Sequence, residues 1–157
     1  MDRSDQINTF NRFARVSRET INSLKIYEEM LFEANKGLNL IGKSTINQIW
    51  IRHFLDSFQV IDLIDKNDHS ITDIGTGAGF PGIVLSIAAN ERKIPLKIKV
   101  IEKSKKKIRF LNELINKLNL NVVTVEQNVF DDTFKFTESN FVVRAFKPLK
   151  VILELIH

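Results

Sequence analysis

The stretch ITDIGTGAGFPGIVLSI, residues 71–87, holds four of the six glycines of this 157-residue chain. Apolar residues stand on both sides of these glycines, and Asp73 lies two residues before the first of them. Glycines let the backbone adopt positive φ angles and approach a ligand closely. The pattern predicts a strand, a glycine turn and a helix, with Pro81 near the helix start, where its missing N–H costs nothing.

Strands and helices alternate on the C-terminal side of this stretch. The apolar patterns predict strands over 70–75, 95–102, 121–129 and 141–146, and helices over 80–90, 103–120 and 149–156. Such alternation favours parallel pairing through right-handed crossovers. We therefore expect an α/β, Rossmann-like fold with a doubly wound, mostly parallel sheet, and a ligand crevice at the carboxyl ends of its strands.

The N-terminal part of the chain has a different pattern. Apolar residues recur at three- and four-residue steps over 18–35 and 45–65, which predicts amphipathic helices. We expect residues 1–66 to form a helical extension packed on a core of residues 67–157.

Composition narrows the class of protein. The chain is 43% hydrophobic and 27% charged, which is ordinary for a globular domain. It has no cysteine, so disulfides and thiolate zinc sites are excluded, and we expect no metal. The first residues lack the apolar core of a signal peptide, and no apolar run is long enough to span a membrane. We expect a cytoplasmic protein without a membrane partner.

The spacing Asp73-x-Gly75-x-Gly77-x-Gly79 restricts the class of ligand that the turn can bind. It fails the strict dinucleotide fingerprint, and it lacks the Lys-Ser/Thr pair of a phosphate-binding loop. A carboxylate two residues before the first glycine would instead attract a positive group, such as the amino group or sulfonium of S-adenosylmethionine. We expect Asp73 and the three glycines to contact that cofactor.

Glu102 is a second acidic residue that we expect at the ligand crevice, because it stands at the carboxyl end of the second predicted strand. A carboxylate there can accept hydrogen bonds from the two ribose hydroxyls of a nucleoside. NAD would use the same interaction, so Glu102 alone does not separate the two cofactors, and an NAD-dependent oxidoreductase stays an alternative.

Five motifs together resemble one known family. They are NKGLNLIGKST, WIRHFLDSFQV, DIGTGAGFPGIVLSI, EKSKKKIRFL and VVRAF. Their order and spacing are similar to those of ribosomal RNA small subunit methyltransferase G, also called glucose-inhibited division protein B. The resemblance implies a methyltransferase that uses S-adenosylmethionine to methylate N7 of one guanine in 16S ribosomal RNA, with the RNA or the small ribosomal subunit as partner.

The resemblance also implies cofactor contacts at Gly75, Phe80, Val129, Phe130 and Arg144. The family usually has an acidic residue where Phe130 stands, so a side-chain contact of that kind is lost here, whereas a backbone contact is kept. The family also continues well past the last residue of this chain. We therefore expect a core that is incomplete at the C-terminus, and a non-catalytic remnant that binds cofactor or RNA is a second alternative.

The expected reaction requires no general base, because guanine N7 carries a lone pair and no proton. Orientation of N7 towards the methyl group would then be the main catalytic effect. His53 and Asp56 stand three residues apart and share a helix face, which makes them the candidate catalytic residues. Trp50 and Phe80 are candidates for stacking on bases, and Phe80 is expected to be the more open of the two.

Positive charge is concentrated beside the expected crevice. The net charge is only +4, but a basic cluster directly follows Glu102. Such a cluster can contact RNA phosphates. We expect an RNA-binding surface on a monomer, formed by Arg52, Lys103, Lys105, Lys106, Lys107 and Arg109.

Overall fold

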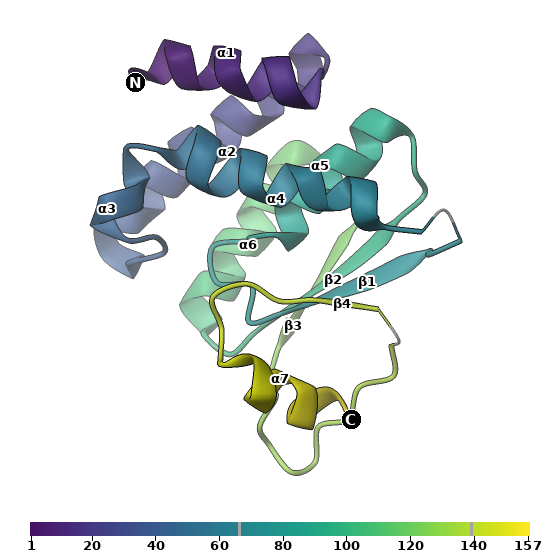
Figure 1. Ribbon diagram of the computed structural model, residues 1–157. Coiled ribbons are helices and arrows are strands. Elements are labelled where there is room, and N and C mark those ends of the chain that lie inside the picture. Colours follow the sequence, from purple (N-terminus) through teal and green to yellow (C-terminus); the bar gives the residue numbers. More distant parts are fainter. Residues whose placement is uncertain (66, 139) are drawn as a thin grey trace.

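The computed structural model of the chain describes residues 1–65, 67–138 and 140–157. Position 66, where we expected a boundary, and position 139 lie outside these residues. Figure 1 shows the elements, which are α1 (Arg3–Ala14), α2 (Arg18–Leu38), α3 (Lys43–Ile46), η1 (Trp50–Leu55), α4 (Asp56–Phe58), η2 (Gln59–Leu63), β1 (Ser70–Ile74), α5 (Gly82–Arg92), β2 (Lys97–Glu102), α6 (Lys105–Leu118), β3 (Val122–Glu126), β4 (Phe141–Val142) and α7 (Leu149–Ile156).

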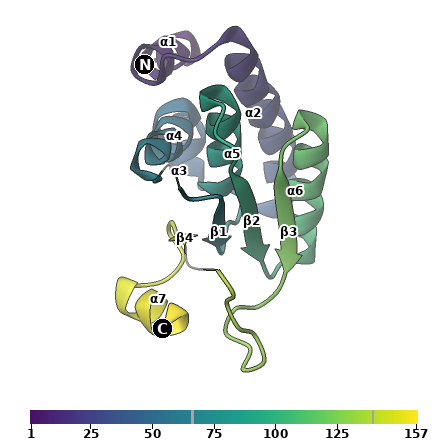
Figure 2. The same ribbon diagram turned by 90° about the vertical axis from the view of Figure 1, so that its right-hand side faces the viewer.

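The sheet has four strands in the order β3-β2-β1-β4, and every pair is parallel. Figure 2 shows the strands side by side in this order. From β1 the chain moves outward to β2 and β3, and then returns to pair β4 with the opposite edge of β1. The direction of winding therefore reverses between β1 and β4, at the place where doubly wound sheets bind ligands. The predicted fold class is confirmed.

Two hydrophobic cores cover the two faces of the sheet. The larger core joins Ile71, Ile98 and Val100 to the helices from α1 to α6. The smaller core contains Ile74 and Ile101, and the C-terminal residues of α7 pack against it. Figure 1 shows α7 on the opposite side of the sheet from the other helices. The buried residues of β1 and β2 thus lie on both faces of the sheet, which is typical of the central strands of a parallel sheet.

Helix α2 is tied to the sheet region at two places. At its start, Glu91 of α5 accepts hydrogen bonds from the hydroxyls of Ser17 and Thr20, at 2.7 and 2.5 Å. Near its middle, the buried Tyr27 hydroxyl donates to the carbonyl of Ala78 at 2.7 Å. Tyr27 therefore joins α2 to the glycine turn directly, whereas Ser17 and Thr20 join the start of α2 to α5. Among the described residues, no helix combines the length and the apolar character needed to cross a membrane.

Two predicted elements differ from the structure. The helix expected over 45–65 is divided into short segments, and one of them, η1, is a π-helix. The strand expected over 141–146 pairs with β1 only through Phe141 and Val142. Beyond them Ala145 adopts a left-handed conformation with φ of 50°, which turns the chain away from β1. The apolar pattern of 141–146 does not reveal this turn.

Candidate active site

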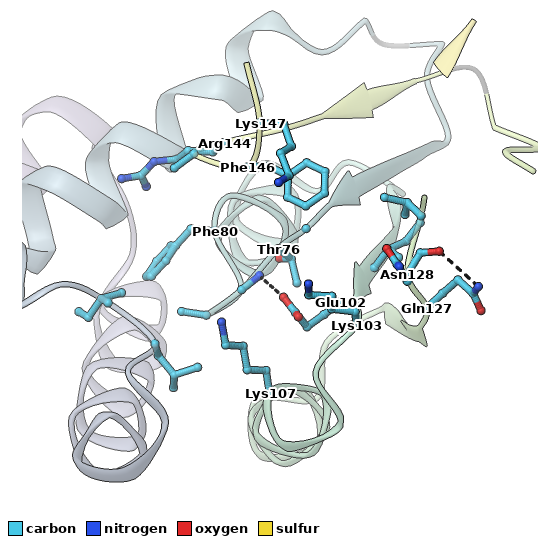
Figure 3. A pocket seen from close by; sticks show the side chains of 18 of the residues that line it. Thr76, Phe80, Glu102, Lys103, Lys107, Gln127, Asn128, Arg144, Phe146 and Lys147 are labelled. Carbon is cyan, nitrogen blue, oxygen red and sulfur yellow. Dashed lines mark hydrogen bonds between the residues drawn. The ribbon is translucent and has the colours of Figure 1, made fainter. Parts of the chain in front are cut away.

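A cavity of about 550 Å³ opens at the carboxyl ends of the strands. Figure 3 shows Phe80, Glu102, Asn128 and Phe146 around it. The segments that follow all four strands contribute to its wall, together with Leu40, Ile41 and Gly42 from the N-terminal part of the chain. The cavity therefore lies where strand order and the glycine stretch predicted a crevice.

The glycine turn follows β1 and forms one side of the cavity. Gly75, Gly77 and Gly79 have φ angles of 68°, 59° and 104°, which side-chain-bearing residues rarely adopt. Gly75 and Gly77 line the cavity, and a Cβ atom on Gly75 would overlap the ring of Phe146. Gly79 instead faces Tyr27 and Ile83 and does not reach the cavity wall. A Cβ atom on Gly79 would therefore meet α2 and α5, whereas the cofactor contact expected at Gly79 stays a prediction.

Asp73 lies behind the turn and is fully buried. Its Oδ2 atom accepts hydrogen bonds from the Thr76 hydroxyl at 2.6 Å and from the Gly82 N–H at 2.8 Å. Its Oδ1 atom is buried without a partner. Burial raises the pKa of Asp73 to about 6, although both hydrogen bonds favour the charged form.

These contacts bear on one prediction. Asp73 is fully buried and does not line the cavity, so a direct contact of its carboxylate with a ligand there is not supported, whereas attraction through water stays a prediction. It shapes the turn instead, by joining the Thr76 side chain to the first N–H of α5. The sequence placed Asp73 beside the glycines, but only the folded backbone determines which way the carboxylate points.

Glu102 ends β2 and does line the cavity. Its two oxygens accept from the N–H groups of Gly77, at 3.1 Å, and Ser104, at 2.9 Å. Figure 3 draws the bond to Gly77 as a dashed line. Each carboxylate oxygen can accept a second hydrogen bond. Glu102 is therefore fixed between the glycine turn and α6 and keeps acceptor capacity for a ligand in the cavity.

Arg144, after β4, connects the cavity to η1. Its guanidinium donates to the Arg52 carbonyl at 2.8 Å and lies 3.3 Å from His53 Nδ1 and 3.6 Å from Asp56 Oδ2. The structure thus brings together the two candidate catalytic residues and one predicted cofactor residue. Arg144 and His53 line the cavity, whereas Asp56 is half exposed and stands outside the wall.

The contacts of His53 define its protonation state. Arginine can only donate, so Nδ1 accepts from Arg144, and Nε2 carries the proton towards the Thr45 hydroxyl at 2.9 Å. Burial, followed by the positive charge of Arg144, lowers the pKa of His53 to about 4. His53 is therefore neutral at neutral pH and links Thr45, after the loop at residues 40–42, to Arg144.

Phe80 lines the cavity but is only 6% exposed. Its ring stacks on Tyr27 at 5.3 Å between centroids, with His53 at 4.8 Å. Phe80 is slightly more open than the fully buried Trp50, as expected, but neighbouring rings leave little of its surface for a base to stack on. Trp50 is fully buried in the larger core, so a base-stacking role is excluded for it.

The segment after β3 forms the wall beside Glu102. Val129 is buried in the smaller core, whereas Phe130 is 43% exposed, and both line the cavity. Asn128 lines it too, and its side chain is held by the N–H of Phe130 and the carboxylate of Asp131. The two predicted cofactor positions are therefore at the wall, one of them with an exposed aromatic ring.

The predicted RNA-binding residues divide into two groups. Lys103 and Lys107 line the cavity beside Glu102, as Figure 3 shows. The others are exposed away from the wall, namely Arg52 on η1, and Lys105, Lys106 and Arg109 on α6. The start of α6 thus carries positive charge from the cavity mouth onto the outer surface. Among the described residues, no cluster of His, Asp and Glu could hold a metal ion.

Sequence reasoning missed several residues of the wall. Thr76 lies within the glycine turn, and Phe146 and Lys147 stand two and three residues after Arg144. The only available signal was that each of them lies close in sequence to a residue already identified. Leu40, Ile41 and Gly42 belong to the motif NKGLNLIGKST, which carried part of the family resemblance, but nothing in their residue types indicates a cavity.

Two solved methyltransferase structures align with the chain at low identity. Coclaurine N-methyltransferase bound to N-methylheliamine and SAH is 14% identical, with a TM-score of 0.46, and the match covers 89% of this chain and 48% of that one. A protein-L-isoaspartate O-methyltransferase from Plasmodium falciparum, in complex with S-adenosyl-L-homocysteine, is 15% identical, with a TM-score of 0.45, covering 83% and 79%.

Sequence comparison is more specific. Proteins called ribosomal RNA small subunit methyltransferase G from Pelagibacter ubique, Mycoplasma capricolum and Rickettsia akari are 39%, 39% and 38% identical to the chain. These matches cover 90%, 89% and 90% of the chain, but 67%, 60% and 70% of the relatives' own lengths. A family model for rRNA small subunit methyltransferase G matches residues 20–157. The chain belongs to the rRNA small subunit methyltransferase G family.

Proposed function

We propose that this chain binds S-adenosylmethionine in the cavity and methylates N7 of a guanine in 16S ribosomal RNA. The observation that carries the proposal is the hydrogen bond between Gly77 and Glu102. This bond joins the glycine turn to a carboxylate that can still accept hydrogen bonds. Both line one cavity, at the edge of the sheet where the direction of winding reverses. The proposal includes a monomer that acts in the cytoplasm on the RNA or on the small ribosomal subunit.

The residues present fit this cofactor. A cavity of about 550 Å³ is within the usual size range of small-molecule sites. The turn at Gly75 and Gly77 would hold the amino-acid end, Glu102 would accept from the ribose hydroxyls, and the backbone at Val129 and Phe130 would face the adenine. When bound, S-adenosylmethionine supplies an electrophilic methyl group on a positively charged sulfur.

The chain's own residues would serve orientation rather than proton transfer. N7 has no proton to lose, and His53 already uses both ring nitrogens on Thr45 and Arg144. His53 therefore acts as a positioning residue for Arg144 in this proposal, and Asp56 supports the same guanidinium from outside the cavity. Catalysis would come from holding the acceptor nitrogen in line with the methyl group.

The proposal assigns residues 67–157 to the methyltransferase core and residues 1–66 to a helical extension. The bond from Tyr27 to Ala78 and the bonds from Ser17 and Thr20 to Glu91 support the packing of the extension on the core, because they join the two parts at the glycine turn and at α5. The extension would then stabilise the cofactor site without lining most of it.

Gly75→Ala tests the cofactor site. The added methyl group would overlap the Phe146 ring, and the φ angle of 68° disfavours any side chain. We expect isothermal titration calorimetry to show at least roughly tenfold weaker binding of S-adenosylmethionine, a loss of about 1.4 kcal/mol.

Gly37→Ala is the matched control. Gly37 lies in α2, its added Cβ would meet no atom within 4 Å, and we expect unchanged binding. Methylation of undermethylated small ribosomal subunits then separates an active enzyme from a non-catalytic remnant. The absence of measurable cofactor binding by the unsubstituted chain would contradict the proposal.

A further inference from the structure

The aromatic side chains on the cavity wall differ in how much of their surface is free. Of the described residues, three phenylalanines line the cavity, Phe80, Phe130 and Phe146. Phe80 is enclosed by Tyr27 and His53. Phe130 is 43% exposed and Phe146 is half-buried. Phe130 and Phe146, which we call the aromatic pair, are therefore the phenylalanines of the wall that can offer ring surface to a ligand.

The aromatic pair bridges two segments of the wall. The rings of Phe130 and Phe146 stack with centroids 5.8 Å apart and planes 18° apart. Phe146 rests on Gly75, which has no side chain to hold it off. The Lys147 ammonium lies 5.8 Å from the centroid of the Phe130 ring. Two nearly parallel rings and one cation thus stand together between the segments that follow β3 and β4.

Two aromatic rings with a lysine beside them suit the binding of a single nucleotide. A base stacks on aromatic rings through its flat face, and a lysine beside the rings can meet its phosphate. The carboxylate of Glu102 occupies a different part of the wall and suits hydroxyl groups rather than a flat ring. The side chain of Phe130 cannot accept a hydrogen bond from an amino group, so it is free for stacking even where its backbone faces a cofactor.

We propose that the aromatic pair is the stacking surface for the acceptor guanine, with Lys147 contacting the phosphate of the same nucleotide. This inference rests on the proposed function and adds the residues that hold the substrate base. Stacking fixes the plane of the guanine ring, and N7 lies in that plane. The pair would thereby orient N7 towards the donor side of the cavity, which makes Phe130 and Phe146 positioning residues.

The test compares Phe130→Leu and Phe146→Leu with Phe130→Tyr and Phe146→Tyr. Leucine keeps apolar bulk and removes the ring, whereas tyrosine keeps the ring. Saturation-transfer NMR with guanosine 5′-monophosphate reads the contact directly and requires no methyl transfer. We expect transfer to the guanine H8 proton with the unsubstituted chain and both tyrosine variants, and its loss in both leucine variants.

Kinetics on undermethylated small ribosomal subunits give a second readout. Because base stacking is lost, kcat/KM for the subunit should fall roughly tenfold to a hundredfold in each leucine variant. The dissociation constant of S-adenosylmethionine is measured by calorimetry for each variant, and the fall in kcat/KM should exceed any fall in donor affinity. Phe134→Leu is the control, since Phe134 packs in the same hydrophobic cluster but does not line the cavity, and it should behave like the unsubstituted chain.

Several outcomes would overturn this inference. They are the absence of saturation transfer with the unsubstituted chain, transfer that survives in both leucine variants, or a loss of donor affinity that accounts for the whole kinetic effect. Failure of the proposed function is separate, because it would show as no binding of S-adenosylmethionine in calorimetry, while the NMR contact of guanosine monophosphate is read without the donor.

Discussion

Asp73 shows that a sequence can place a residue correctly without revealing what its side chain contacts. Its position before the glycines marks the end of β1, and the sequence identified it for that reason. Its carboxylate is buried and accepts hydrogen bonds from Thr76 and Gly82, so in the structure it supports the turn. The direction of one side chain depends on the pleat of β1 and on α5 packing behind it, which no spacing rule contains.

The burial of Asp73 makes a pH dependence that can be measured. Its pKa is about 6 in the folded chain against 3.8 as the ordinary value. The folded state therefore binds the proton more tightly, and its contribution to stability is full below pH 4 and is lost as pH rises through 6. The loss amounts to about 3 kcal/mol.

Asp73→Asn removes this titration. We expect the free energy of unfolding of the variant, minus that of the unsubstituted chain, to rise by about 2 kcal/mol between pH 4 and pH 7. His53 titrates in the opposite sense, because its lowered pKa adds stability as pH rises from 4 to 6.5, but it is present in both proteins and cancels. Urea unfolding at several pH values measures the difference, and a difference that stays flat over this range would refute the assignment.

At the scale of elements, the sequence predicted best those helices and strands whose positions depend on the local pattern of apolar residues. β1, β2, β3, α5, α6 and α7 lie where the apolar runs and helical periodicity placed them. The helix expected over 45–65 is divided, and β4 has two residues in place of six. Arg144 joins the two segments through its contacts with Arg52 and His53, which stand about ninety positions away in the sequence, and a local pattern does not contain such a contact.

The contact between α2 and the glycine turn carries a second prediction. Tyr27→Phe keeps the stacking on Phe80 but removes the hydroxyl that donates to the Ala78 carbonyl. This leaves a buried acceptor unpaired, which costs about 1–3 kcal/mol. We expect the free energy of unfolding to fall by that amount, which lowers the urea midpoint. We also expect weaker binding of S-adenosylmethionine, because the turn loses its support.

The matched control for this prediction is Thr124→Ser. Thr124 is on the outer strand β3, away from the turn, and serine keeps its hydroxyl contact with Asn112. An unchanged midpoint for Tyr27→Phe would mean that the helices of the N-terminal part do not hold the turn through this bond.

At the scale of the whole molecule, the arrangement of charge matters more than its sum. A net charge of +4 identifies no partner, yet Lys103 and Lys107 stand at the cavity and the other basic residues of α6 continue outward from there. Sequence order alone predicted that the basic cluster begins beside the cavity, because a segment that follows β2 must start at the carboxyl edge of a parallel sheet. It did not predict which of the lysines face the cavity, since that depends on the rotation of α6.

The position of Lys103 and Lys107 at the cavity leads to a prediction about RNA binding. If Lys103 and Lys107 contact phosphates, each contact releases bound counterions, and affinity falls steeply with salt. Replacing both by Gln should reduce the slope of log K against log salt concentration by about 2. Lys117→Gln is the control, because Lys117 is exposed in the last turn of the same helix, far from the cavity end, and should leave the slope unchanged. Filter binding of 16S ribosomal RNA at several salt concentrations measures both, and equal slopes for all three proteins would place the RNA on another surface.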